Sequence, residues 1–224
     1  IVVGLSSGLE VDWSVRCCPL DLRTMTLSLG GPEEHLFQWA SDEVNAFYHG
    51  REPTRTSGTL HSQAKLPDAQ ALAERMGGML TSALVGARHF GGAGMLSLDE
   101  VFSPEQLVLD CELKDHVQRL LKGIEAYCDP SACLDEVATG IAEGGFAGLQ
   151  STAREWRGVY LSPRLFERRG LHGWMAAGSP GLRTRAKDYA RACLREHEYE
   201  LEPDLRREIE RISADAERVL GDEA

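Results

Sequence analysis

The sequence lacks the features of membrane, secreted and nucleic-acid-binding proteins. No apolar run reaches the roughly 18 to 20 residues that cross a bilayer, and no basic region precedes the apolar Ile1–Leu9 as it would in a signal peptide. Basic residues are few, 24 Lys and Arg against 35 Asp and Glu, and the net charge of −11 argues against binding to nucleic-acid phosphates. We therefore expect a cytosolic protein whose partners include neither a membrane nor a nucleic acid.

Common site motifs are missing as well. The six cysteines form no CxxC pair and no histidine pair has zinc spacing, so we predict reduced thiols and no metal site. The absence of a GxSxG elbow disfavours a serine hydrolase, and the absence of GxGxxG makes Gly91–Gly94 a weak nucleotide motif. The carboxylates between Asp99 and Glu112 leave a glycosidase pair open, because their separation depends on the fold.

Short apolar or glycine-rich stretches alternate with amphipathic helices up to Gly123. Helices are predicted to begin at Pro32, after Pro67 and at Ser103, where Ser103–Gln106 has the form of a capping box. Strands are predicted near residues 54–60 and 87–90. The first helix is expected to bury an apolar stripe formed by Leu36, Phe37, Ala40, Val44, Phe47 and Tyr48.

Repeated strand–loop–helix order is typical of a parallel sheet with helical crossovers. Beyond Gly123 the pattern predicts helices only, one near residues 132–142 and two long ones at the end of the chain. A complete eight-stranded barrel needs about 250 residues. We therefore predict an α/β fold: a partial (β/α) TIM-type barrel, its C-terminal strands, over residues 1–123, and an α-helical tail over residues 124–224 that packs on the barrel or forms an oligomer surface.

Two loops are the candidate site, because parallel sheets bind ligands at the carboxyl ends of their strands. These loops are residues 57–67 and 91–103, each between a predicted strand and a helix. In the first, Gly58, His61, Gln63 and Lys65 are candidate substrate-binding residues, since the loop crowds small and hydrogen-bonding groups together. A plain polar connection ended by Pro67 explains the same residues equally well.

Two motifs resemble the trimethylamine methyltransferase family. They are KLPDAQA at residues 65–71 and FSPEQLVLD at residues 102–110, and segments 144–146 and 163–169 are also similar. The likeness extends over most of the chain from about Gly31. It implies a (β/α)-barrel enzyme that moves a methyl group from a small methylated amine to the cobalt of a corrinoid on a separate cognate protein, with no cofactor bound by the chain directly.

The resemblance also implies site residues and a substrate. His89, Gly91, Gly92 and Gly94 are expected to face the corrinoid, because small residues leave room for a macrocycle. Family members that act on trimethylamine carry pyrrolysine, which we place in the 58–65 loop; only ordinary residues occur there, so a quaternary amine such as a betaine is expected.

An alternative function follows from the length of the chain. Family members are longer and this chain has no initiator Met, so we expect it to begin inside a longer protein. The alternative to an enzyme is a non-catalytic truncated barrel that acts as a binding module or as a homo-oligomer joined through its helical tail.

Overall fold

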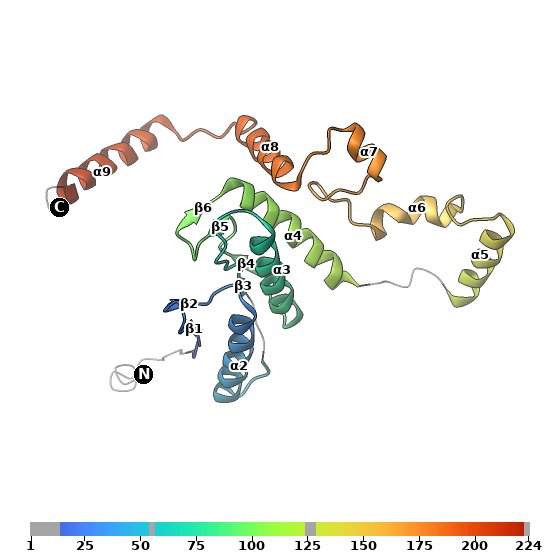
Figure 1. Cartoon of the computed structure of the whole chain (residues 1–224), viewed down its shortest axis with the longest axis horizontal. Coiled ribbons are helices and arrows are strands. Elements are labelled where there is room, and N and C mark those ends of the chain that lie inside the picture. The colour runs from blue at the N-terminus through green and yellow to red at the C-terminus, as the bar shows by residue number, and fades with distance from the viewer. Residues whose placement is uncertain (1–13, 54–56, 124–128, 222–224) are drawn as a thin grey trace. The chain divides into compact units, whose positions relative to one another are not determined.

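The computed structural model describes residues 14–53, 57–123 and 129–221. Helices predominate and strands are short, so the fold is mixed α/β (Figure 1). The strands are β1 (Leu20–Asp21), β2 (Thr26–Leu27), β3 (Ser57–Thr59), β4 (His89–Gly91), β5 (Met95–Leu96) and β6 (Val101–Phe102). The helices are α2 (Pro32–His49), α3 (Ala69–Leu84), α4 (Pro104–Lys122), α5 (Pro130–Ala142), α6 (Gln150–Val159), α7 (Leu171–Ala176), α8 (Leu182–Arg195) and α9 (Pro203–Gly221).

The predicted crossover unit is present as β3–α3–β4. β3 pairs with β4 in parallel, with Ser57 opposite His89 and Thr59 opposite Gly91. β1–β2 and β5–β6 are two-stranded antiparallel pairs that the sequence did not predict. The mixture of helices and strands confirms the predicted α/β class. Within the described ranges the strands form three separate pairs and close no barrel, so the partial (β/α) barrel stays a prediction. The predicted strand residues 54–56 lie outside the described residues.

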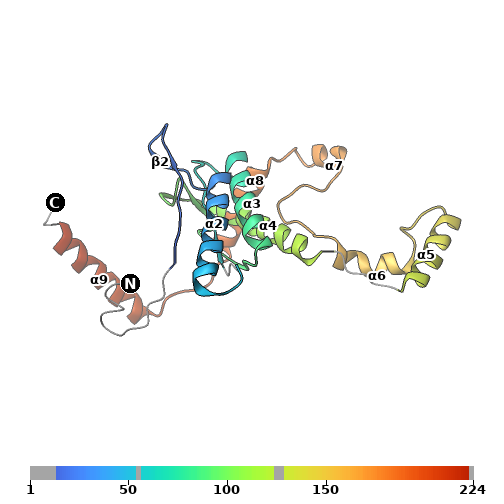
Figure 2. The same cartoon turned by 90° about the horizontal axis from the view of Figure 1, so that it is seen from below.

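The core lies between α3 and α4, which pack against each other (Figure 2), and β3 and β4 lie beside α3 (Figure 1). Asp68 starts α3 as predicted, and its carboxylate accepts the backbone N–H of Gln70 at 3.0 Å. The buried apolar side chains of this core are Leu60, Met79, Ala83, Leu113 and Val117. Burial of a side chain of the size of Met79 or Leu113 contributes about 1.5–3 kcal/mol.

Only half of the predicted capping box forms at the start of α4. The Ser103 hydroxyl accepts the backbone N–H of Gln106 at 3.2 Å, with Pro104 in the first turn. The Gln106 amide does not reach back to Ser103; it donates to the Asp110 carboxylate at 2.8 Å. In a complete capping box the Gln106 side-chain oxygen would accept the Ser103 N–H, but that N–H donates to the Gly94 carbonyl at 2.8 Å instead.

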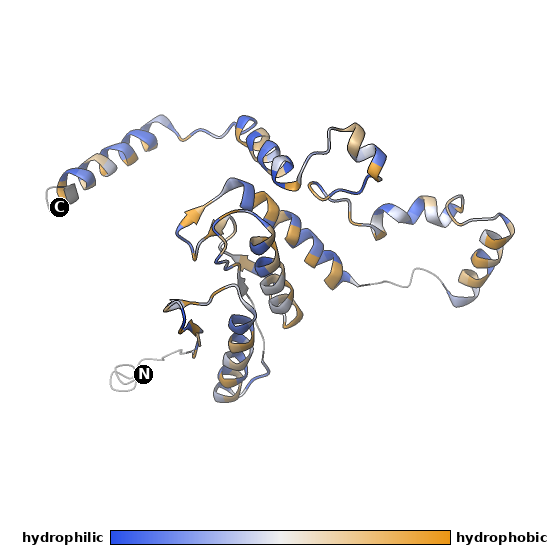
Figure 3. Cartoon of the chain, in the orientation of Figure 1, coloured by the Kyte–Doolittle hydropathy of each residue, from blue (hydrophilic) through white to orange (hydrophobic). Residues whose placement is uncertain are grey.

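The prediction of which face of α2 is buried was wrong. The helix begins at Pro32 as predicted and ends at Gly50 in a left-handed conformation, but its buried residues are Glu34, Gln38, Ser41 and Ala46. The predicted apolar stripe is exposed instead, as Leu36 at 61% and Phe47 at 79% show, and α2 carries hydrophobic segments along its length (Figure 3). Hydrogen bonds of Glu34, described below, hold the polar face inward.

A buried ion pair connects the two core helices. Arg75 of α3 donates to Asp110 of α4 at 2.7 Å, and the two side chains are 0% and 1% exposed. The same carboxylate oxygen accepts the Gly94 N–H at 2.7 Å, and Arg75 also donates to the Gly92 carbonyl at 3.2 Å. Burial raises the pKa of Asp110, an effect that the charge of Arg75 opposes. One pair thus holds α3, α4 and the glycine loop together.

The part of the chain after α4 is helical, as predicted, where the structure describes it. Residues 1–190 form one compact unit and residues 191–224 a second; the predicted boundary at residue 123 stays a prediction. α9 is amphipathic, with exposed Leu205, Ile209, Ile212 and Val219. Among the described residues no helix is long and apolar enough to cross a membrane. The prediction of reduced thiols holds at Cys17, Cys18, Cys111 and Cys193 but not at Cys133, which is disulfide-bonded.

Substitution of Asp110 by Asn is expected to lower the free energy of unfolding by about 3–5 kcal/mol, because it leaves the Arg75 guanidinium buried without a counter-charge. Urea unfolding followed by circular dichroism measures the change. The double variant Arg75→Met/Asp110→Leu is expected to lose less than Asp110→Asn, since removal of both charges also removes their desolvation cost. Asp188→Asn, at an exposed aspartate of α8, is the control; an equal loss there would contradict the assignment.

Candidate functional site

The two candidate loops lie side by side. Because β3 and β4 are parallel, the loops that follow them leave the same end of the pair. A backbone hydrogen bond of 2.8 Å from the Leu60 N–H to the Gly91 carbonyl continues the pairing into the loops. The prediction that residues 58–65 and 91–94 are neighbours at adjacent strand ends is therefore confirmed.

A strained turn joins the same two loops a second time. The Ser97 N–H donates to the Ala64 carbonyl at 2.9 Å, and the Leu98 N–H donates to the Ser62 carbonyl at 3.0 Å. Ser97, Leu98 and Asp99 have left-handed φ angles of 52°, 57° and 78°. This conformation costs about 1–2 kcal/mol per non-glycine residue, and such strain concentrates at functional sites.

All four predicted substrate-binding residues have structural contacts, and those of Lys65, Gln63 and Gly58 shape the first loop. Lys65 donates to the Ser97 hydroxyl at 2.9 Å, and the Gln63 side-chain amide donates to the carbonyl of Leu27. A Cβ atom on Gly58 would lie 2.9 Å from the Ser82 side chain, so the absence of a side chain there lets α3 approach the strand. These contacts shape the loop, and a substrate role for the three residues stays a prediction.

His61 is held by a buried carboxylate. Its Nδ1 lies 2.6 Å from Oε1 of Glu34, and the histidine side chain is 17% exposed against 3% for the glutamate. Glu34 also accepts the Gly30 N–H at 2.6 Å and the Gln38 amide at 2.8 Å. A carboxylate only accepts, so Nδ1 carries the hydrogen and Nε2 is the acceptor nitrogen of the neutral ring. The arrangement fixes both the orientation and the tautomer of the imidazole.

Hydrogen bonds lower the pKa of Glu34. Burial alone would raise this pKa, but donation from His61 and from the Gly30 N–H outweighs burial and brings the value below the ordinary one. The carboxylate is therefore ionised at neutral pH.

The residues predicted to face a corrinoid differ in exposure, and their role at a corrinoid stays a prediction. Gly91 and Gly92 are exposed, and a Cβ atom on Gly91 would meet nothing within 4 Å. Gly94 is buried, and a Cβ atom there would lie 2.6 Å from the Phe102 ring, so this glycine serves packing. His89 lies at the start of β4, away from the loop end, and lines a hollow of about 300 Å³ together with Cys111.

Three residues that build the site, Glu34, Glu74 and Arg75, were missed in the sequence, and Asp110 was noted only as one of the acids between Asp99 and Glu112. Glu34, Glu74, Arg75 and Asp110 all lie on helices, where polar residues are usually solvated. Glu74 accepts from the Ser62 hydroxyl at 2.7 Å and from the Gln63 N–H at 2.9 Å, which fixes the first loop on α3. The spacing of Glu34 and Gln38, one helical turn apart, was the available signal for a polar inner face.

Acid is expected to weaken the fold through Glu34. Because its folded pKa is lowered, the ionised side chain stabilises the fold above the ordinary value of about 4.3, and this stabilisation is lost as pH falls through the lowered pKa. Glu34→Gln is expected to cost about 1.5–3 kcal/mol at pH 7 and to flatten the acid limb of a stability–pH curve measured by urea unfolding. Glu33→Gln, at the exposed neighbour, is the control; an unchanged acid limb in Glu34→Gln would refute the prediction.

The family model and the relatives that match this chain point to the same family. The family model described as trimethylamine methyltransferase (MTTB) matches residues 15–218. A trimethylamine methyltransferase of Methanosarcina mazei is 32% identical over 214 residues, which are 95% of this chain and 42% of that protein.

Two bacterial relatives extend the comparison. A trimethylamine methyltransferase of Desulfitobacterium hafniense is 28% identical, covering 84% of the chain and 37% of the relative. A glycine betaine methyltransferase of Desulfitobacterium hafniense is 27% identical, covering 84% and 38%. The chain thus spans about two fifths of the length of the curated relatives that it matches. The extent of the family match shows that this chain belongs to the trimethylamine methyltransferase family.

Proposed function

We propose that this chain forms part of a methyltransferase that takes a methyl group from a methylated amine, with the joined loops 58–65 and 91–99 at its substrate site. The observation that carries the proposal is the oriented imidazole of His61 beside a strained turn at the ends of two parallel strands. The relatives support the reaction class, since they are named for trimethylamine and for glycine betaine. We further propose that the complete protein is a (β/α) barrel, to which β3, α3, β4 and α4 contribute.

The role proposed for His61 is to position the amine. A methylated ammonium group carries its positive charge on the methyl surface and has no N–H donor when it is quaternary. The imidazole turns Nδ1 to Glu34 and leaves its ring face and Nε2 to contact such a surface, and the Glu34 carboxylate behind it favours a cation in the same region. The net charge of −11 also favours a cationic substrate over an anionic one.

The proposed methyl acceptor is a reduced corrinoid on a partner protein. Such a corrinoid supplies a cobalt electron pair that forms the bond to the methyl carbon, while the electron pair of the broken carbon–nitrogen bond stays on the amine. The chain must leave the strand ends uncovered for this partner, and the exposed Gly91 and Gly92 fit that requirement. Buried Gly94 does not contribute to the opening.

Methyl transfer is the test of this proposal. Trimethylamine or glycine betaine is incubated with the gene product that carries this chain and with a corrinoid protein held as cobalt(I). Methyl-cobalt is followed by absorbance, and the demethylated amine by mass spectrometry. We expect both products in equal amounts with at least one of the two amines. His61→Gln is expected to lower kcat/KM roughly 100-fold, because a small misplacement of substrate has that effect.

Two controls make the result specific. His172→Gln changes an exposed histidine of α7, outside both loops, and is expected to leave kcat/KM unchanged. Circular dichroism checks that His61→Gln keeps the helical content. Absence of methyl-cobalt with both amines, or an unimpaired His61→Gln variant, would contradict the proposed site.

A non-catalytic binding module is the second candidate. It is favoured by the unclosed strand pairs among the described residues. Calorimetry separates the two: saturable amine binding without any transfer supports the module, and transfer excludes it.

A further inference from the structure

An arginine-rich segment begins in α6 and continues past its end in this acidic chain. Residues 154–169 contain five arginines and two glutamates, a local excess of three positive charges where the whole chain has a net charge of −11. The proposed methyl transfer does not use these charges. A local positive region of this kind favours the binding of an anionic ligand over a cationic one.

The two glutamates of this segment are already engaged. Glu155 accepts from Arg154 at 2.7 Å. Glu167 accepts from Arg169 at 2.7 Å and from Arg185 at 2.7 Å. Because both glutamates of the segment are paired in this way, the segment has no further carboxylate to neutralise its other arginines.

Arg157 and Arg168 form no ion pair with a described carboxylate. Among the described residues no carboxylate lies within ion-pair distance of either guanidinium. Arg157 instead stacks on the Trp156 ring, with its Cζ 4.5 Å from the ring centroid. Arg164 lies 3.5 Å from Asp115, a longer and weaker contact. At least two guanidinium groups are thus available to bind an anionic ligand.

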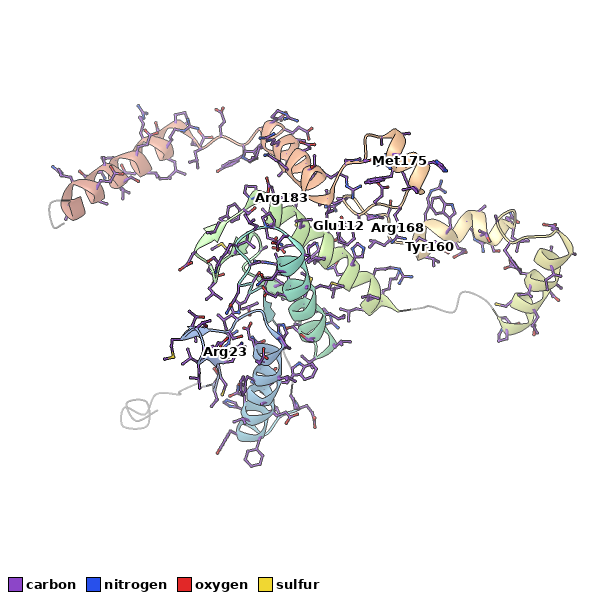
Figure 4. The ribbon with its side chains drawn as sticks, in the orientation of Figure 1. Arg23, Glu112, Tyr160, Arg168, Met175 and Arg183 are labelled. Carbon is purple, nitrogen blue, oxygen red and sulfur yellow. The ribbon has the colours of Figure 1, made fainter. Side chains whose placement is uncertain are left out.

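These side chains line a hollow with aromatic walls. One cavity of about 690 Å³ is lined by Arg157, Arg168, Trp156 and Tyr160 among others. A second, of about 570 Å³, adjoins it and shares Tyr160, Leu161 and Arg168 (Figure 4 marks Tyr160 and Arg168 in this region). Small-molecule sites measure about 300–1,000 Å³, so each cavity has room for a ligand with a ring and a charged group.

The wall of the hollow is fixed to the core. Both carboxylate oxygens of Glu112 in α4 accept backbone N–H groups, from Arg164 at 3.1 Å, Leu165 at 3.3 Å and Phe166 at 3.2 Å. Leu165 is buried with Leu109 of α4. Three backbone bonds to one buried acid hold this turn in place before any ligand arrives, which reduces the entropy lost on binding.

The hollow is separate from the candidate methyl-transfer site. It borders α4 at His116, Arg119, Leu120 and Gly123, at the C-terminal end of the helix. The strand-end loops lead into the other end, at Ser103. The 19 residues of α4 at a rise of about 1.5 Å each put those ends nearly 30 Å apart.

We propose that this hollow binds a phosphate ester that carries a planar aromatic ring, a ligand of the nucleoside diphosphate class. Guanidinium groups bind phosphate oxygens through paired hydrogen bonds. Exposed aromatic rings such as Trp156 and Tyr160 stack on planar bases. Two available arginines match the charge of a diphosphate, and the apolar walls match the ring.

Calorimetry on the full 224-residue chain tests the site with ADP as the probe. Inorganic pyrophosphate and adenosine are titrated in parallel, to separate the contribution of phosphate from that of the ring. We expect ADP to bind saturably, each half-ligand to bind at least 10-fold more weakly, and the ADP affinity to fall as salt is raised. Arg157→Gln and Arg168→Gln are each expected to weaken ADP binding 5- to 10-fold.

Arg154→Gln is the matched control, because Arg154 lies on the same helix, is paired with Glu155 and does not line the hollow. It is expected to keep the affinity for ADP. The proposal is overturned if ADP does not saturate, if adenosine binds as well as ADP, or if Arg154→Gln loses as much affinity as Arg168→Gln. Binding of an acidic protein in place of ADP would also overturn it. None of these readouts depends on methyl transfer, so the two proposals fail separately.

Discussion

The contact between Arg75 and Asp110 is the constraint on which the site depends. A charge buried to this extent is stable only with its partner, and here the partner belongs to the next core helix. The same aspartate accepts a hydrogen bond from the Gly94 N–H, and the same arginine donates one to the Gly92 carbonyl. The position of the glycine loop is therefore set by the packing of α3 on α4. The loop therefore keeps one position although its first glycines are exposed and have no side chains to pack.

The strand-end loops show how backbone strain is balanced by hydrogen bonds. Three consecutive residues, Ser97 to Asp99, adopt a conformation that their side chains disfavour. Two backbone bonds to the 62–64 segment and the contact of Lys65 with Ser97 hold them there. Loops that are costly to form and separately anchored on α3 and α4 keep a fixed relative geometry, which is a requirement for binding a substrate in one orientation.

Local signals in the sequence predicted the elements well and their faces less well. Asp68 and Ser103 marked the helix starts, because capping depends only on residues within one turn. The inner face of α2 depends on Gly30 and His61, which are remote in sequence or outside the helix, and no periodicity contains that information. The neighbouring loops followed from strand direction alone, whereas the carboxylates that orient them required the coordinates. The family likeness rested on two short motifs, both of which turn out to lie at these loops and helix starts.

The reversed polarity of α2 separates two properties that usually go together. Its inward side is positioned by directional contacts from Glu34, and its outward side carries the large apolar groups. A change of chemistry on the outer side leaves the contacts that seat the helix untouched. The surface that α2 presents can therefore diverge to suit different neighbours, while the imidazole it supports keeps the same orientation.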